Sequence, residues 1–184
     1  MVQGVNSMNE IFVVIDYQKD FVDGVLGFEK AKTLENNIFE AVEKALDEGK
    51  KVFFTLDTHT DNYMSTREGK NLPVPHCIDE SDGHRLYGML ENFYDKDGVV
   101  MVKKSGFGSS TLADIIKNIC GVPDVIKMCG VVTNMCVIAN AIVLQTEFEN
   151  ADIRILSDMC ASFDDELHNK AIDVMKNMHM TIVE

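Results

Sequence analysis

Six short apolar runs recur along the chain and alternate with amphipathic segments. Each run is nearly continuous, and most are rich in β-branched residues and bounded by polar or glycine positions, which is typical of strands buried on both faces. The runs cover residues 11–15, 52–56, 99–102, 125–129, 153–156 and 180–183. Because strands and helices alternate, the pattern predicts an α/β fold whose parallel sheet is covered by helices on both faces.

The segments between the runs have helical periodicity. Residues 34–46 place apolar side chains on one helical face, and Gly49 stands where such a helix would end. Residues 133–149 are mostly apolar and predict a buried helix. A further apolar stripe precedes the last run and consists of Leu167, Ala171, Val174 and Met178. Residues 58–83 are the one long irregular stretch, and such a loop in a compact domain is usually functional or mobile.

Composition and charge limit the classes of function. The 184 residues are 46% hydrophobic, which suits one domain over residues 9–184, with residues 1–8 as a leader or a disordered terminus. The net charge of −13 excludes nucleic acid and anionic membranes as partners. No apolar run reaches the roughly 18–20 residues that span a membrane. Five cysteines in a chain without an export signal predict reduced thiols and a cytoplasmic location.

Chemistry-bearing side chains follow several of the predicted strands. In an open α/β sheet, ligands bind at the carboxyl ends of the strands, so we expect these side chains on one rim. They are Asp16, Asp57 with His59, Lys103 with Lys104, the turn 130–136, and Ser157 with Asp158. An acid, a metal-type pair, a lysine and a cysteine therefore converge.

Cys136 is the candidate nucleophile. It falls in the first turn of the helix after residues 125–129, where the helix dipole and unpaired backbone N–H groups favour thiolate and can hold an oxyanion. Asp16 beside it would act as a general base, and a lysine ammonium would stabilise both charges. Strand alternation sends one of Lys103 and Lys104 into the site and the other away. The competing interpretation is a buried packing cysteine, a loop-capping aspartate and solvated lysines.

Asp57, His59, Glu68 and His76 form a candidate metal site. Carboxylate oxygen and imidazole nitrogen suit zinc, manganese and iron(II). Each of the four could alone be an ordinary surface residue. They lie close in sequence and on the same predicted rim as Cys136, so together they are a stronger indication of a metal.

The chain resembles the isochorismatase-like cysteine hydrolases, and most closely their nicotinamidase branch. The segments that carry the resemblance are VVIDYQKDF with Asp16, TLDTH with Asp57 and His59, LPVPHC with His76, VKKSGFGSSTL with Lys104, and CGVVTNMCV with Cys136. They span residues 13–137 in the family's order. The resemblance implies a six-stranded parallel sheet in a Rossmann-like three-layer sandwich.

The resemblance also implies a set of roles for residues of this chain. The catalytic triad would be Asp16, Lys104 and Cys136. A cis peptide bond would join Val131 and Val132, and the backbone N–H groups of Val132 and Cys136 would form the oxyanion hole. The spacing from Lys104 to the FGS segment resembles a K-x-x-F-G-S form of the family, which predicts that Lys104, and not Lys103, faces the site.

Two departures from the family bear on the metal ligands and the substrate. Many nicotinamidases have a second histidine soon after the D-x-H pair, where this chain has Tyr63, whereas Glu68 matches a glutamate that others use. The implied ligands of one divalent ion, with zinc as the first choice and manganese or iron as the others, are Asp57, His59, Glu68 and His76. The chain has no tryptophan, so the aromatic side chains available to contact a pyridine ring are Phe21, Tyr63 and Phe107.

The implied reaction is hydrolysis of nicotinamide to nicotinate and ammonia through a thioester on Cys136. The implied binding partner is thus a small-molecule amide substrate, and the protein is expected to be a homo-oligomer. Two alternatives stay open. One is a related hydrolase that acts on another small amide or carbamoyl compound. The other is a catalytically silent protein that binds a metal or ligand on this fold. The presence of Asp16, Lys104 and Cys136 together argues against the silent protein, which has no need of all three.

Overall fold

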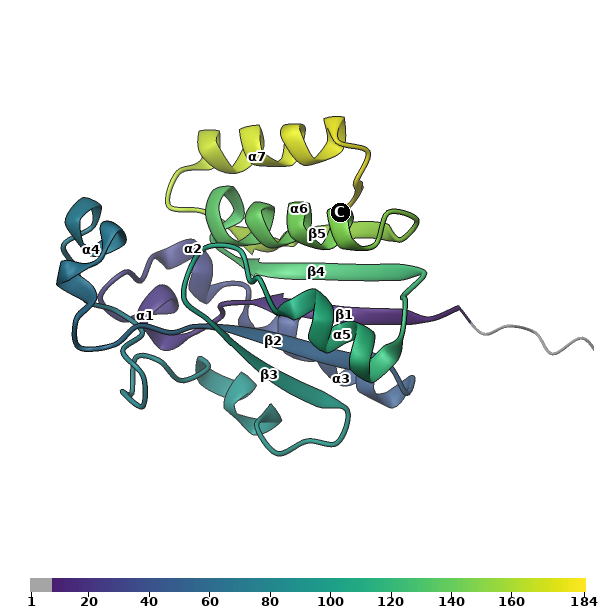
Figure 1. Cartoon of the computed structure of the whole chain (residues 1–184), viewed down its shortest axis with the longest axis horizontal. Helices are drawn as coiled ribbons and strands as arrows, with labels where there is room; N and C mark the ends of the chain where they lie inside the picture. Colours follow the sequence, from purple (N-terminus) through teal and green to yellow (C-terminus); the bar gives the residue numbers. More distant parts are fainter. Residues whose placement is uncertain (1–7) are drawn as a thin grey trace, which may run out of the picture.

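All six predicted strands are present in the computed structural model, which describes residues 8–184, and they form one parallel sheet (Figure 1). The sheet order is β3-β2-β1-β4-β5-β6, so the chain starts in the middle and winds outward in both directions. The strands are β1 (Glu10–Ile15), β2 (Lys51–Asp57), β3 (Val99–Lys104), β4 (Val125–Val131), β5 (Asp152–Ala161) and β6 (Thr181–Val183). The predicted leader, residues 1–8, lies outside the described residues except for Met8.

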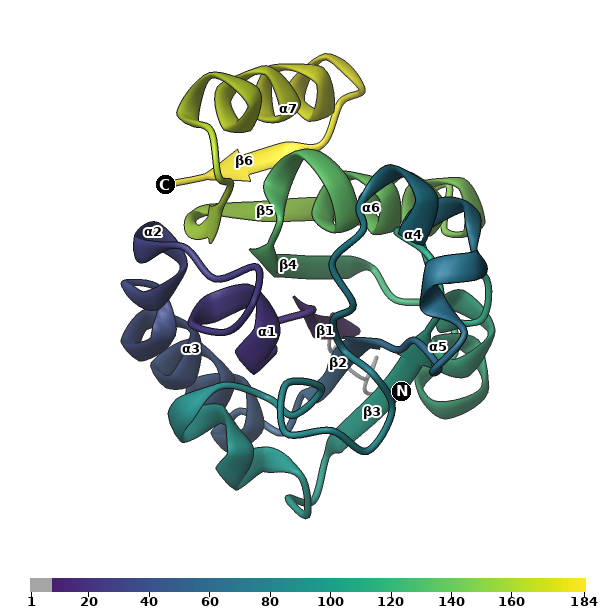
Figure 2. The same ribbon diagram turned by 90° about the vertical axis from the view of Figure 1, so that its left-hand side faces the viewer.

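Helices cover both faces of the sheet, as predicted (Figure 2). One face carries α1 (Lys19–Val22), α2 (Glu29–Lys32) and α3 (Glu35–Asp47), and the other carries α5 (Leu112–Cys120), α6 (Ile138–Glu147) and α7 (Asp165–Asn177). The connection from β2 to β3 contains α4 (Arg67–Asn71) and 3₁₀ turns at Tyr63–Ser65 and Gly88–Phe93, and a π-helical turn, Thr133–Val137, precedes α6. Within residues 8–184, no helix combines the length and the apolar character needed to cross a membrane.

The packing of α3 follows directly from its sequence. Its apolar face buries Ile38, Val42 and Ala45 against β1 and β2. Full burial of each larger aliphatic side chain stabilises the fold by about 1.5–3 kcal/mol. Gly49 ends the helix with φ of +75°, a left-handed conformation that glycine adopts without steric cost, so the predicted stop is confirmed.

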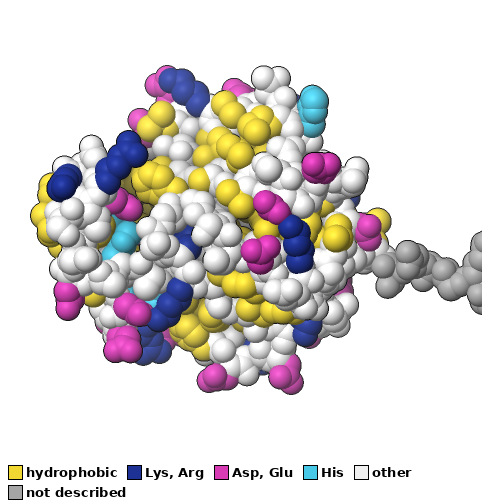
Figure 3. Space-filling model, viewed as in Figure 1, with side chains coloured by type: hydrophobic (Ala, Val, Ile, Leu, Met, Phe, Trp, Pro, Cys, Tyr) yellow, Lys and Arg dark blue, Asp and Glu magenta, His cyan; other side chains and the backbone are white. Residues whose placement is uncertain are grey.

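The predicted apolar stripe of α7 is only partly buried. The helix packs through Ala171 and Met175, whereas Leu167 and Val174 are 45% and 48% exposed. The reason is that α7 lies over β5 and the edge strand β6, which offer only a narrow surface. The predicted burial of residues 133–149 is also too broad, because Ile142 is 37% exposed. Hydrophobic side chains accordingly gather on the surface over α6 and α7 (Figure 3).

Strand β5 is longer than its apolar run predicts. Its pairing with β4 passes from Ile155 to Cys160 through a bulge, so Ser157 and Asp158 lie within the strand and not at its carboxyl end. The Ser157 hydroxyl donates to the Val183 carbonyl on β6. The expectation that these two residues reach the ligand-binding rim was therefore wrong, because a bulge interrupts the apolar run before the strand ends.

Candidate active site

The carboxyl ends of three strands bring the predicted triad together. Asp16 directly follows β1, Lys104 is the last residue of β3, and Cys136 lies in the π-helical turn after β4. The Lys104 Nζ atom is 2.6 Å from Asp16 Oδ2 and 3.7 Å from Cys136 Sγ. All three side chains are buried. The sheet therefore places an acid, an ammonium and a thiol within contact of one another.

Asp16 is held in an uncommon backbone conformation. Its φ of +46° is left-handed, a region that few residues other than glycine, asparagine and aspartate adopt. The Thr55 hydroxyl, from the neighbouring strand β2, donates to Asp16 Oδ1 at 2.6 Å. The other carboxylate oxygen, Oδ2, is the one buried side-chain oxygen or nitrogen in residues 8–184 without a hydrogen bond of good geometry. This oxygen is thus left for the ion pair with Lys104.

Lys103 and Lys104 point to opposite sides of β3, as strand alternation requires. Lys104 is almost fully buried, and its Nζ atom also contacts Asp57 Oδ1 at 3.1 Å and donates to the Gly106 carbonyl. The Lys103 side chain is 55% exposed and pairs with Asp79. The prediction that Lys104 faces the site is confirmed.

The turn that carries Cys136 is fixed on several sides. The peptide bond between Val131 and Val132 is cis, as the resemblance implied. Gly130 has φ of +118°, and a Cβ atom at this position would lie 2.1 Å from the Ile15 carbonyl oxygen, so only glycine lets β4 approach the end of β1 here. The Thr133 hydroxyl bonds to His168 of α7 at 2.8 Å. The turn is therefore anchored to both the sheet and α7.

Asn140, fully buried on α6, links this turn to the loop after β3. Its amide group donates to the carbonyls of Cys136 and Phe107 and accepts from the Ser109 N–H. Gly108 brings the same loop close to α6, since a Cβ atom there would contact Val143 at 3.3 Å. Cys136 and the loop that follows Lys104 are thus held together through Asn140.

The protonation states follow from burial and charge. Burial raises the pKa of the Cys136 thiol well above its usual value, the Asp16 charge adds to this, and Lys104 opposes it. Burial also raises the pKa of Asp16, against the effect of Lys104. For Lys104, burial alone would lower the pKa, but Asp16, Cys136 and Asp57 raise it. Burial of Cys136 thus opposes the thiolate that the helix terminus is expected to favour, whereas the Lys104 charge supports it.

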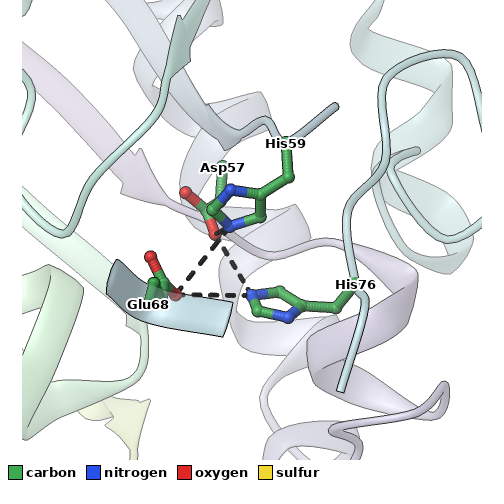
Figure 4. A group of neighbouring side chains, drawn as sticks. All are labelled: Asp57, His59, Glu68 and His76. Carbon is green, nitrogen blue, oxygen red and sulfur yellow. Dashed lines mark hydrogen bonds and ion pairs between the residues drawn. The ribbon is translucent and has the colours of Figure 1, made fainter. Parts of the chain in front are cut away.

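The four predicted metal ligands converge at the same rim (Figure 4). Each of Asp57, His59, Glu68 and His76 offers one ligand atom, and these atoms lie within 4.8 Å of one another. His76 Nδ1 lies 2.8 Å from the Val74 carbonyl, which fixes Nδ1 as the protonated nitrogen and leaves the Nε2 lone pair directed at the cluster. Three ligands are buried and all are nitrogen or oxygen donors, so the set fits a divalent ion such as zinc.

Asp57 joins the candidate metal site to the predicted triad. Its Oδ2 atom is 3.0 Å from His59 Nε2, while its Oδ1 atom contacts Lys104. Burial alone would raise the pKa of Asp57, but hydrogen bonds with His59 and His76 and the Lys104 charge hold it well below its usual range. The pKa of His76 is raised, since bonds to Asp57 and Val74 outweigh burial. The carboxylate is therefore ionised and available to both neighbours.

The three predicted substrate-contacting aromatics lie in different surroundings. Phe21 is buried and packs edge-on against His76, with ring centroids 5.3 Å apart. Tyr63 is also buried, lies edge-on against both His59 and His76, and donates its hydroxyl to the Leu72 carbonyl. Phe107 is 46% exposed. Two of the aromatics thus support the metal-site histidines, and contact of any of the three with substrate stays a prediction.

Sequence reasoning missed three buried polar residues of the site: Gln18, Thr55 and Asn140. Gln18 donates to the Asp57 and His84 carbonyls and accepts from the Asp57 N–H, which fixes the backbone of the metal ligand. A signal existed for Thr55, because it is the one hydroxyl inside the otherwise apolar run of β2. Such a side chain in a buried strand needs a partner, which here is Asp16.

Comparison with known proteins agrees with the α/β fold. The sequence model of the isochorismatase domain matches residues 10–184. No curated protein matches the sequence. Many solved structures are similar over almost the whole chain, and three of them illustrate the likeness. The nicotinamidase of Bacillus subtilis is 25% identical, with a TM-score of 0.85, over 96% of this chain and 100% of the other.

The pyrazinamidase/nicotinamidase of Streptococcus mutans is 28% identical, with a TM-score of 0.84, over 95% of this chain and 99% of the other. The pyrazinamidase of Pyrococcus horikoshii, solved in complex with zinc, is 23% identical, with a TM-score of 0.82, over 96% of this chain and 99% of the other.

Proposed function

The chain belongs to the isochorismatase family, and from that premise we propose that it is a nicotinamidase, a cysteine amidohydrolase that converts nicotinamide to nicotinate and ammonia. Its fold is that of hydrolases that act on non-peptide C–N bonds. One observation carries the proposal. Asp16, Lys104 and Cys136 are in buried contact, and Lys104 also contacts Asp57, which is one of the four residues of the candidate metal site. Similarity to the nicotinamidases of Bacillus subtilis and Streptococcus mutans supports it.

The proposed reaction begins with proton transfer from the Cys136 thiol to Asp16 Oδ2. The thiolate attacks the amide carbonyl carbon, and the backbone N–H groups of Val132 and Cys136 hold the oxyanion. Asp16, now an acid, returns the proton to the departing nitrogen, so that the C–N bond breaks and ammonia leaves a thioester. Asp16 then takes a proton from a water molecule as that water attacks the thioester carbonyl carbon. The C–S bond breaks, Asp16 returns the proton to the departing Cys136 sulfur, and the product leaves as nicotinate after its carboxyl group loses the remaining proton of the water to solvent.

Lys104 keeps this sequence electrostatically balanced. Its ammonium lies beside Asp16, Asp57 and Cys136, which are all buried, and buried charges interact more strongly than charges in water. When Asp16 gives or takes its proton, the cation compensates whichever group carries the negative charge. The lysine itself transfers no proton, because its pKa is raised.

We propose zinc as the ion held by Asp57, His59, Glu68 and His76, in line with the zinc complex of the Pyrococcus horikoshii pyrazinamidase. A divalent ion there supplies a Lewis-acid site for a ring nitrogen and for water. Asp57 and His59 are positioned by the end of β2, and Glu68 and His76 come from the long connection to β3. The aromatic side chains of Phe21, Tyr63 and Phe107 would then guide the pyridine ring.

Removal of one ligand is expected to abolish metal binding. We expect His76→Ala to retain less than about a tenth of an equivalent of metal after metal-supplemented purification, because three remaining ligands leave the site incomplete. His84→Ala is the matched control, since His84 is equally buried but lies outside the cluster. Elemental analysis measures both. Wild-type protein with less than about a tenth of an equivalent of any transition metal would contradict the site.

Metal removal is also expected to loosen the connection that supplies two of the ligands. A bound ion would tie Glu68 and His76 to Asp57 and His59 at the end of β2, in addition to the direct ion pairs among these residues. Hydrogen exchange of residues 60–75 should therefore rise on chelation, while the exchange of β1 and β4 stays unchanged. Equal protection of residues 60–75 with and without metal would show that the protein alone holds this connection.

An amide panel separates the proposal from its closest rival. We expect ammonia release from nicotinamide to exceed release from benzamide by at least about tenfold in kcat/KM, because benzamide lacks the ring nitrogen that a metal would bind. Preference for benzamide, another simple amide or an N-carbamoyl compound would favour the related hydrolase instead.

We also expect a homo-oligomer and, since all five cysteines are unpaired, a cytoplasmic location.

A further inference from the structure

Asp16 has two chemically equivalent oxygens, but its surroundings treat them differently. Thr55 lies on β2 directly across from Ile15 of β1, one residue before Asp16. The Thr55 hydroxyl donates to Asp16 Oδ1 at 2.6 Å. In return, the backbone N–H of Asp16 donates to the Thr55 hydroxyl oxygen and to the Thr55 carbonyl oxygen, each 3.2 Å from the Asp16 nitrogen. Thr55 is fully buried, so water does not compete for this hydroxyl.

This reciprocal pairing also secures the backbone of Asp16. Its left-handed φ of +46° is unfavourable for a residue with a side chain, and contacts to both the N–H and the carboxylate hold it there. The carboxylate is consequently fixed in rotation, with Oδ1 occupied by the hydroxyl. Only Oδ2 remains, at 2.6 Å from Lys104 Nζ and without a hydrogen bond of good geometry.

We propose that Thr55 is a positioning residue that reserves Asp16 Oδ2 as the atom that exchanges the proton with Cys136. The inference deepens the proposed amidase function and rests on it for the role of Asp16. Thr55 does not touch the nucleophile. It acts through Asp16 by occupying Oδ1 and preventing rotation of the carboxylate.

Thr55 should also influence the acidity of Asp16. Its hydrogen bond favours the ionised carboxylate and so lowers the pKa of Asp16. The other groups that face Asp16 are the ammonium of Lys104, the carboxylate of Asp57 and the thiols of Cys136 and Cys77. These groups are unchanged in a Thr55 variant, so a shift in the pH profile reports the loss of the hydroxyl.

The test compares Thr55→Val, which keeps the branched shape, with Thr55→Ser, which keeps the hydroxyl. For metal-supplemented Thr55→Val we expect kcat/KM on nicotinamide to fall about 10- to 100-fold, mainly through kcat, since one group that orients the base is lost. The acid limb of the profile should move to higher pH by about one unit, because an unbonded carboxylate binds its proton more tightly. Thr55→Ser should remain within about threefold of wild type.

Thr181→Val is the matched control. Thr181 on β6 donates its hydroxyl to Asp152 on β5 at 2.7 Å, which is the same chemical pair at the far edge of the sheet. Its loss should leave the rate and the pH profile unchanged. If Thr55→Val does not fold, Thr55→Ser and Thr55→Ala form a second pair that differs only in the hydroxyl. A wild-type rate and profile in Thr55→Val, or equal losses in the serine and alanine variants, would overturn the proposal.

Alkylation of Cys136 by iodoacetamide separates this inference from the proposed function, because it needs no substrate. The acid limb of a plot of alkylation rate against pH reports loss of a proton from the Asp16–Cys136 pair. The midpoint of this limb should shift to higher pH in Thr55→Val but not in Thr55→Ser. If the midpoint shifts in Thr55→Val but the wild-type protein does not hydrolyse nicotinamide, nicotinamide is not the substrate and the role of Thr55 stands. If the wild-type protein hydrolyses nicotinamide but no Thr55 variant shifts the midpoint, the proposed function stands and the role of Thr55 is refuted.

Discussion

Replacement of Cys136 by alanine is expected to lower nicotinamide turnover by at least about 1,000-fold, because the covalent route disappears when the nucleophile is removed. The fold should persist. Cys136 is buried in the π-helical turn, but that turn is held by Gly130, by the Thr133–His168 bond and by Asn140, none of which uses the thiol. Initial rates of ammonia release and circular dichroism measure the two effects.

Cys160→Ala is the matched control for this variant. Cys160 is also a buried cysteine, but it lies within β5, where it is paired with Gly130 of β4. Its replacement removes the same sulfur atom from the core and should leave turnover near that of the wild type. Residual activity of Cys136→Ala above about one hundredth of wild type would contradict a covalent mechanism.

Replacement of Lys104 by methionine is expected to damage both stability and activity. The ammonium neutralises two buried carboxylates, Asp16 at 2.6 Å and Asp57 at 3.1 Å, and methionine would leave both uncompensated. Breaking a buried ion pair from one side costs about 3–5 kcal/mol. For a chain of this size, that corresponds to a fall in Tm of about 10 °C. Thermal unfolding and ammonia release at a temperature where the variant is folded measure the two effects.

Lys103→Met, at the preceding residue, is the matched control. Its ammonium is exposed and pairs with Asp79 on the surface, where ion pairs add little to stability because solvent screens them. This variant should keep both its Tm and its activity. Equal losses in Lys103→Met and Lys104→Met would show that neither lysine has a special role. Full activity in folded Lys104→Met would remove the lysine from the mechanism.

The strands and the rim were predictable because the signals are local. Continuous apolar runs marked all six strands. Asp16, Asp57 and Lys104 follow three of these runs and were therefore expected at the edge of the sheet where the carboxyl ends of the strands lie. Alternation along β3, with the resemblance, separated Lys104 from Lys103. The cluster of Asp57 with His59, Glu68 and His76 was likewise implied by close spacing and by the resemblance.

The features that sequence reasoning missed depend on tertiary contacts. The bulge in β5 moved Ser157 and Asp158 away from the rim, and no local pattern marks where pairing with β4 breaks. The exposure of Leu167 follows from the position of α7 at the edge of the sheet. Desolvation raises the pKa of Cys136 and so opposes the effect expected from a helix terminus, and the hydrogen bond between Thr55 and Asp16 joins residues that are 39 apart in the sequence. Such effects become visible only once the sheet is assembled.

Parallel assays of ammonia and nicotinate decide whether this site hydrolyses nicotinamide through Cys136. Metal-supplemented wild-type protein should release the two products in equal amounts over many turnovers, chelation should suppress the release, and Cys136→Ala should release neither above the blank. Wild-type protein that releases no more ammonia from nicotinamide than Cys136→Ala does would contradict the account.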